Sequence, residues 1–186
     1  MESDPGMSAP INEASAPPLL TPLLNLAPAI EFGEDRRVIR SSPFEIDWQG
    51  FKDRYVTDRH RMALASNLLA WLREARSVVQ LSHIWIGGSF ASAKADPADV
   101  DAVLFFHYRG AAMTAAARDS FLTAHPHVFE SLAMKARYGV DGACVALSMP
   151  PSRLVQFAAY WAMVYSNGPD GSRRAFYSIP ATTFPI

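Results

Sequence analysis

Two aspartates separated by a single residue, Asp99 and Asp101, are the side chains of this 186-residue chain whose spacing points most directly to chemistry. In an extended strand, residues i and i+2 share one face and lie about 7 Å apart along the chain. Their carboxylates therefore point into one small volume, where they repel each other unless a cation lies between them. Mg²⁺, or Mn²⁺ in its place, takes a few such oxygen ligands and completes its shell with substrate phosphates. The pair predicts a divalent-metal site that handles phosphate groups.

A glycine-rich turn precedes the aspartates and could supply the second half of a phosphate site. Gly87, Gly88 and Ser89 follow the apolar stretch 84–86. Glycines let a backbone approach an anion closely, and turn N–H groups with a serine hydroxyl donate hydrogen bonds to phosphate oxygens. Lys94, in the loop that follows, offers a positive charge for a triphosphate. Two plainer interpretations stay open: an ordinary tight turn for the glycines, and a solvated loop lysine for Lys94.

Together these residues resemble a known signature. An apolar strand, Gly-Gly-Ser, about ten residues and then Asp-apolar-Asp-apolar is similar to the motif of the polymerase-beta-type nucleotidyltransferase superfamily in its minimal form. The segments 51–56 and 171–174, together with Tyr138-Gly139-Val140-Asp141, extend the likeness to a small bacterial group of nucleotidyltransferase-like proteins. The resemblance covers roughly residues 44–179.

The resemblance implies a mixed sheet flanked by helices and a specific set of site residues. Asp99 and Asp101 would be catalytic metal ligands, Ser89 would contact the β- or γ-phosphate of a nucleoside triphosphate, and Asp141 matches the position of a third carboxylate. The implied reaction moves a nucleotidyl group to a hydroxyl on protein, RNA or a small molecule. Gly142 departs from the pattern, because an apolar strand residue usually follows the third carboxylate.

Other functions remain open at this stage. One is a catalytically silent nucleotidyltransferase-like protein of a toxin–antitoxin type pair, which binds a protein partner through the apolar segment 19–32. Another is a glycosyltransferase, in which an Asp-x-Asp strand end also holds a metal and a nucleotide sugar. The chain is short for that fold, and the Gly-Gly-Ser turn has no role in it.

Composition narrows the class of protein. With 186 residues, 49% of them hydrophobic, the chain suits one domain with its own core. A net charge of −1 provides no global field for nonspecific nucleic-acid binding. The single cysteine, Cys144, cannot close an intrachain disulfide, and no run of about 20 apolar residues predicts a membrane span. A cytoplasmic protein without a membrane contact is the expectation.

Proline and hydrophobic periodicity predict how the chain is organised. Seven of the 14 prolines precede residue 44, so residues 1–43 are expected to be a mobile, Pro-rich tail with a draping segment, and residues 44–186 the domain. A long amphipathic helix is expected over about 48–79, with Arg61 on its solvent face. The other expected elements are strands at 82–86, 100–106 and 140–147, helices at 111–124, 126–135 and 153–165, and a closing edge strand at 174–179. This order predicts an α/β (α+β) single domain with a small mixed sheet.

Overall fold

The structure, a computed structural model, describes residues 30–32, 38–110, 113–169 and 171–186, with side chains from residue 41 onward. Its elements in chain order are β1 (Ile30–Phe32), β2 (Val38–Ser41), β3 (Phe44–Glu45), α1 (Trp48–Tyr55), α2 (Arg59–Val78), β4 (Gln80–Gly87), β5 (Val100–His107), α3 (Ala115–Ala124), α4 (Pro126–Phe129), α5 (Ser131–Tyr138), β6 (Val140–Ala146), α6 (Pro151–Ser166), β7 (Tyr177–Pro180) and the 3-10 helix η2 (Ala181–Thr183).

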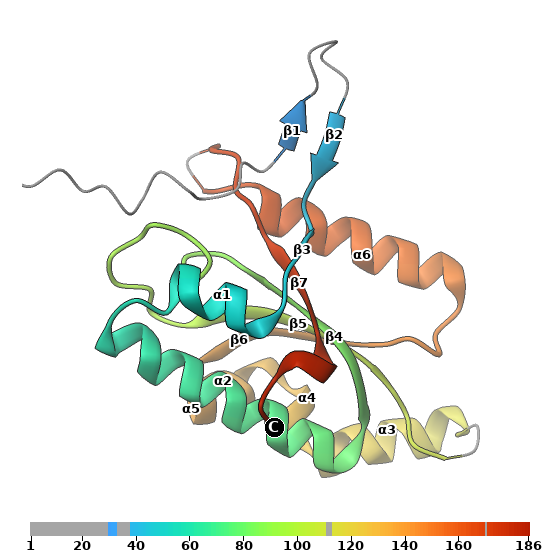
Figure 1. Ribbon diagram of the computed structural model, residues 1–186. Coiled ribbons are helices and arrows are strands. Elements are labelled where there is room, and N and C mark those ends of the chain that lie inside the picture. Colours follow the sequence, from blue (N-terminus) through green and yellow to red (C-terminus); the bar gives the residue numbers. More distant parts are fainter. Residues whose placement is uncertain (1–29, 33–37, 111–112, 170) are drawn as a thin grey trace, which may run out of the picture.

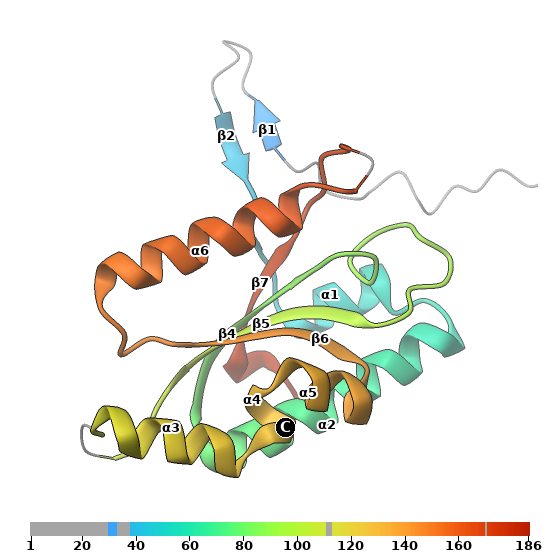
Figure 2. The same cartoon turned by 180° about the vertical axis from the view of Figure 1, so that it is seen from behind.

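A five-stranded mixed sheet in the order β3-β7-β4-β5-β6 forms the middle layer. β4 runs antiparallel to both of its neighbours, whereas β5–β6 and β3–β7 are parallel pairs. Helices α1 to α5 lie on one side of this sheet and α6 lies on the other (Figures 1 and 2). The prediction of a small mixed sheet flanked by helices in a single α+β domain is confirmed.

The helix expected over residues 48–79 is in fact two helices. Asp47 caps α1 by accepting the Gly50 N–H at 2.6 Å, and Asp58 caps α2 by accepting the Arg61 N–H at 2.8 Å. An aspartate with extended backbone just before a helix satisfies one of its unpaired N–H groups. The second cap therefore starts a new helix at Arg59, and the chain changes direction between α1 and α2.

The prediction that residues 174–179 form a closing edge strand is wrong. β7 lies inside the sheet, between β3 and β4, because β3 pairs in parallel with it through Phe44 and Tyr177. β3 has only two residues, too few for a period-2 pattern to show in the sequence. The strands at the two edges are β3 and β6.

β1 and β2 form a separate two-stranded antiparallel sheet within the range expected to be a tail. Ile30 pairs with Ser41, and β2 leads directly into β3. The sequence pattern indicates no strand in this range. Residues 1–29 and 33–37, which include most of the apolar segment 19–32, lie outside the described residues.

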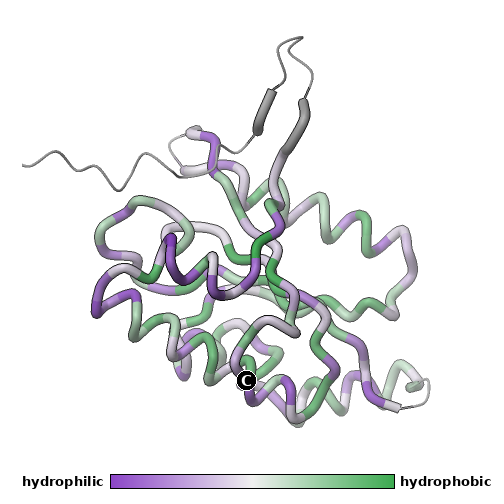
Figure 3. Tube along the Cα trace, in the orientation of Figure 1, coloured by the Kyte–Doolittle hydropathy of each residue, from purple (hydrophilic) through white to green (hydrophobic). Residues whose placement is uncertain are grey.

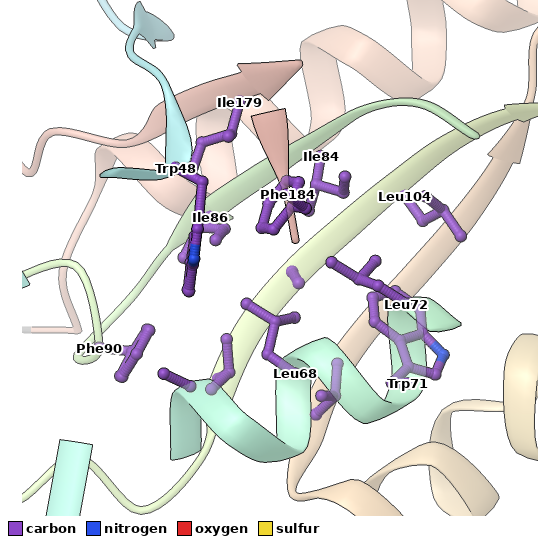
Figure 4. Packing of buried hydrophobic residues seen from close by; sticks show 14 of the residues in the cluster. Trp48, Leu68, Trp71, Leu72, Ile84, Ile86, Phe90, Leu104, Ile179 and Phe184 are labelled. Carbon is purple, nitrogen blue, oxygen red and sulfur yellow. The ribbon is translucent and has the colours of Figure 1, made fainter. Parts of the chain in front are cut away.

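The two faces of the central sheet carry separate cores. The α2-face core contains 26 buried residues, and Figure 4 shows part of it, with Leu68, Trp71 and Leu72 of α2 packed toward the strands. The α6-face core contains only six buried residues. Their identities are Trp85, Val103, Phe105, Val145, Tyr165 and Phe176. None of the helices within the described residues is long and apolar enough to cross a membrane.

Candidate active site

Three carboxylates gather where β4 ends and where β5 and β6 begin. Asp99 immediately precedes β5, and Asp101 and Asp141 are the second residues of β5 and β6. Since the two strands are parallel and Asp101 pairs with Asp141, these side chains are neighbours on one face of the sheet. Val103 and Val145, further along the same strands with the same alternation, belong to the α6-face core. The acidic group therefore lies on the α6 face.

A lysine that no sequence motif marks, Lys135, lies between two of these carboxylates. Its Nζ is 2.8 Å from Asp99 Oδ2 and 2.6 Å from Asp141 Oδ2. The hydrogen bonds to Asp141 and Asp99 raise the pKa of Lys135 above its ordinary value, so it stays an ammonium. Its helix, α5, is fixed to the α2-face core by Met134 and Tyr138. The Lys135 side chain, 48% exposed, reaches the carboxylates from the solvent side.

The negative charge of Asp101 is only partly compensated by its neighbours. Burial, followed by the charges of Asp99 and Asp141, raises the pKa of Asp101 from 3.8 to about 6. A hydrogen bond from the Ser89 backbone N–H and the charge of Lys135 oppose that rise only in part. The cluster therefore holds more negative charge than Lys135 balances, and a further cation would lower its free energy.

The glycine-rich turn folds directly onto Asp101. Gly88 has φ +61°, a conformation that favours glycine, and a Cβ at this position would lie 1.7 Å from Asp101 Oδ2. The Ser89 N–H donates to the same carboxyl. In this structure the turn expected to cradle a phosphate thus holds Asp101, and a phosphate contact of Gly87, Gly88 and Ser89 stays a prediction.

Gly142, which departs from the family pattern, has a steric reason to be glycine. A Cβ on Gly142 would lie 1.7 Å from the backbone carbonyl oxygen of Ala102 on β5. Ala102 and Gly142 are paired in the register that also pairs Asp101 with Asp141. The glycine therefore permits the close approach of β5 and β6 beside the two carboxylates.

Arg61, expected on the solvent face of its helix, is instead 4% exposed. Its guanidinium donates to the backbone carbonyls of Phe90 at 2.7 Å and Ser92 at 2.9 Å, and it also reaches those of Tyr55 and Lys94. Arg61 thus holds the loop between the glycine turn and Asp99. The sequence did contain a signal, because Arg61 lies three and seven residues before the buried Leu64 and Leu68 and shares their helix face.

Lys94 does not join the acidic group. It is exposed, and its described hydrogen bonds are made by its backbone, which accepts from Arg61 at 2.5 Å and donates to Ser92 Oγ at 3.2 Å. The lysine at the carboxylates is Lys135. A role for Lys94 in nucleotide binding stays a prediction.

Tyr165 covers the site from α6. Its ring packs on Gly87, and its hydroxyl is buried with no hydrogen-bond partner among the described residues. Burial, with smaller contributions from Asp101 and Asp141, raises the pKa of Tyr165, so the phenol stays neutral and can donate. An unsatisfied donor next to an acidic group is suited to a ligand oxygen. No pattern in the sequence indicates that Tyr165 lies beside the acidic group.

The donors of the acidic group suit a hard cation, but their arrangement holds Lys135. Within the described residues, no group of three or more His, Cys, Asp or Glu side chains is arranged to hold a metal ion. Carboxylate oxygens are the ligands that Mg²⁺ takes in proteins. Because the Lys135 side chain is half exposed, it can turn into solvent and leave Asp99 and Asp141 to another cation. A Mg²⁺ site at these carboxylates would require Lys135 to move away, and it stays a prediction.

The fold and the site define a class: a mixed α+β domain with three acidic side chains at the ends of neighbouring strands, beside a glycine-rich turn. The chain belongs to a family of unknown function (DUF6932), whose model matches residues 25–179. No curated protein and no solved structure matches the chain.

Proposed function

We propose that this protein is a nucleotidyltransferase that uses Mg²⁺ or Mn²⁺ to move a nucleotidyl group from a nucleoside triphosphate to a hydroxyl on protein, RNA or a small molecule. One observation carries the proposal: Asp101 and Asp141 pair on neighbouring strands with Asp99 just before β5, and burial, followed by the charges of Asp99 and Asp141, raises the pKa of Asp101 to about 6. Perturbed carboxyls of this kind are common at active sites. The single cysteine of the chain favours a reducing compartment, and we place the reaction in the cytoplasm.

The three aspartates, Tyr165 and Lys135 each have a role in this reaction. The three aspartates would hold the metal, which when bound neutralises charge on the phosphates and on the departing pyrophosphate. The acceptor oxygen forms a bond to the α-phosphorus, and the bond from that phosphorus to the pyrophosphate oxygen breaks. The acceptor proton passes to Asp141, whose side chain is 41% exposed. The Tyr165 hydroxyl donates to a phosphate oxygen, and Lys135, once displaced, offers its ammonium to the pyrophosphate.

Isothermal titration with each nucleoside triphosphate, in the presence of Mg²⁺, tests the binding step. We expect the wild-type chain to bind and Asp99→Asn combined with Asp101→Asn to lose most of that binding. Asp96→Asn is the matched control, because Asp96 is an exposed aspartate of the same loop. Release of pyrophosphate in the presence of cell extract as acceptor source then tests the transfer. Nucleotide binding that is equal in all three proteins would contradict the proposal.

Lys135 favours a second candidate function. An ammonium already held by Asp99 and Asp141 at 2.8 and 2.6 Å could replace the metal permanently and leave a catalytically silent binding protein, as in a toxin–antitoxin type pair. This candidate predicts that Mg²⁺ does not change nucleotide binding and that no pyrophosphate is released. It also predicts that a protein partner co-purifies with the Asp99→Asn, Asp101→Asn variant as well as with the wild type.

A further inference from the structure

The outer face of α6 is apolar and almost uncharged. Four of the six large hydrophobic side chains exposed on the described chain belong to this helix. They are Val155, Tyr160, Met163 and Val164, which are 68, 53, 60 and 38% exposed. Arg153 is the one charged residue among the 16 of α6. In Figure 3 the α6 tube is mostly green or pale, whereas the α2 tube alternates between purple and green stretches. A contiguous apolar face of this kind usually has an occupant.

The first described segment of the chain begins next to this helix. Ile30 of β1 pairs with Ser41 of β2. The next residue, Ser42, accepts the Phe176 N–H at 3.1 Å, and the Phe176 ring lies 5.9 Å from that of Tyr165 in the last turn of α6. Arg174 also donates its N–H to the Ser166 carbonyl at 2.9 Å. The chain that precedes Ile30 therefore arrives at the carboxyl end of α6.

The composition and length of that preceding segment match the face. Residues 19–29 contain five leucines and no charged residue. Pro22 and Pro28 make a regular helix unfavourable there. In an extended conformation, 11 residues reach about 36 Å, whereas a 16-residue helix is about 24 Å long. The segment is therefore long enough to run the whole length of α6.

We propose that residues 19–29 lie extended along the outer face of α6 in the same molecule, from its carboxyl end toward its amino end. The leucines of the segment cover Val155, Tyr160 and Met163. This intramolecular docking is independent of the nucleotidyltransferase proposal, because it involves the face of α6 that points away from the acidic site. It also gives the leucine-rich segment a place on the folded body.

Photo-crosslinking in the full-length chain tests the docking. Benzoylphenylalanine is placed at position 23, the protein is irradiated, and tryptic peptides are mapped by mass spectrometry. Trypsin cleaves after Arg153 and Arg173 and so releases residues 154–166 of α6 within one peptide, 154–173. We expect the main crosslink to join position 23 to this peptide. An equimolar mixture of ¹⁵N-labelled and unlabelled chains should give crosslinks within one chain only.

A charge-bearing variant and its control complete the test. Val155→Glu with Met163→Glu should lower the crosslink yield about tenfold, since an unpaired carboxylate would have to be buried under the segment. Met62→Glu introduces the same charge at a 57% exposed methionine on α2 and should leave the yield unchanged. Circular dichroism checks that each variant folds. Crosslinks to another part of the chain, crosslinks between labelled and unlabelled chains, or none at all would overturn the proposal.

Discussion

The two faces of the central sheet are built for different purposes. The α2 face buries 26 residues, and its largest fully buried side chains include Trp71, Tyr177 and Phe51. The α6 face buries six, and at its end the strands carry Asp101 and Asp141 instead of apolar residues. Of the helices in the described chain, α6 covers this second face, whereas α1 to α5 lie on the first (Figure 2).

The residues that stabilise the fold and the residues that could do chemistry therefore lie on different faces of the sheet. Burial of apolar area is the main favourable term in folding, so most of the stability belongs to the α2 face. At one end the α6 face lacks that contribution, because repelling carboxylates lie there beside the Tyr165 hydroxyl, which has no hydrogen-bond partner among the described residues. Groups that are costly for stability and close together are typical of a functional site. Substitutions on the α2 face should therefore change mainly the free energy of unfolding. Substitutions at the acidic end of the α6 face should also change its pH dependence and the binding of a metal ion.

The largest expected effect compares two leucine-to-alanine substitutions. Leu68 on α2 is fully buried, and Leu68→Ala should lower the free energy of unfolding by about 2–5 kcal/mol. Leu154 on α6 is only partly buried against the smaller core, and Leu154→Ala should cost about 1 kcal/mol. Urea denaturation of both variants measures the difference. Equal losses would mean that the two faces share the stability evenly.

The next effect concerns the turn that holds Asp101. Gly88→Ala should cost about 2–4 kcal/mol, because it adds both a strained positive φ and a clash with the Asp101 carboxylate. Gly110→Ala is the matched control: Gly110 has φ +87° but open space around the position of a Cβ. Its cost should be about 1–2 kcal/mol, the strain alone. The difference between the two variants in thermal or urea unfolding measures the clash, and no difference would show that the turn can move away from Asp101.

The sequence predicted the parts of this comparison that depend on local pattern. Alternation within the strand placed Asp99 and Asp101 on one face, and helical periodicity identified the side of α2 that packs on the sheet. Arg61 was misplaced because a charged side chain was assumed to face solvent, although its guanidinium is satisfied by backbone carbonyls inside. Periodicity describes which residues are buried, and it does not show which partners they meet.

Contacts between segments that are distant in sequence account for the features that the sequence did not predict. Lys135 reaches Asp99 across 36 positions of sequence, and no pattern within α5 marks it. The interior position of β7 depends on two residues of β3, and the proximity of Tyr165 to Asp101 depends on how α6 packs. Each of these is set by tertiary packing, which a single sequence does not display.

A pH titration of stability tests the cost of the buried carboxyl. The pKa of Asp101 is raised from 3.8 to about 6 in the folded chain, so the folded state binds the proton more tightly than the unfolded state. This contribution is fully present below about pH 4 and is lost as the pH rises through about 6. Asp101→Asn should therefore be more stable than wild type at pH 7.5 by about 1–2 kcal/mol, allowing for solvent screening.

The same titration contains its own control. Below about pH 4, where Asp101 is protonated in both states, the advantage of Asp101→Asn should disappear. Denaturation is measured in EDTA, so that no metal contributes. Asp96→Asn, an exposed change in the same loop, should show no such pH-dependent gain. A constant advantage of Asp101→Asn at every pH would show that packing, and not the charge of the carboxyl, is responsible.

The smallest effect concerns the lysine that joins the two faces, since Lys135 extends from a helix of the α2 side to the carboxylates of the α6 side. If its ammonium competes with a metal ion, Lys135→Gln should tighten Mn²⁺ binding roughly two- to fivefold, the range expected for exposed ion pairs. Arg137→Gln is the control, because Arg137 lies in the same last turn of α5 but pairs with Glu74 at 3.5 Å. Titration calorimetry with Mn²⁺, without nucleotide, compares the two. Weaker Mn²⁺ binding by Lys135→Gln would instead show that the lysine holds Asp99 and Asp141 in the geometry that the metal requires. The two faces of the sheet would then be coupled through Lys135 and not independent.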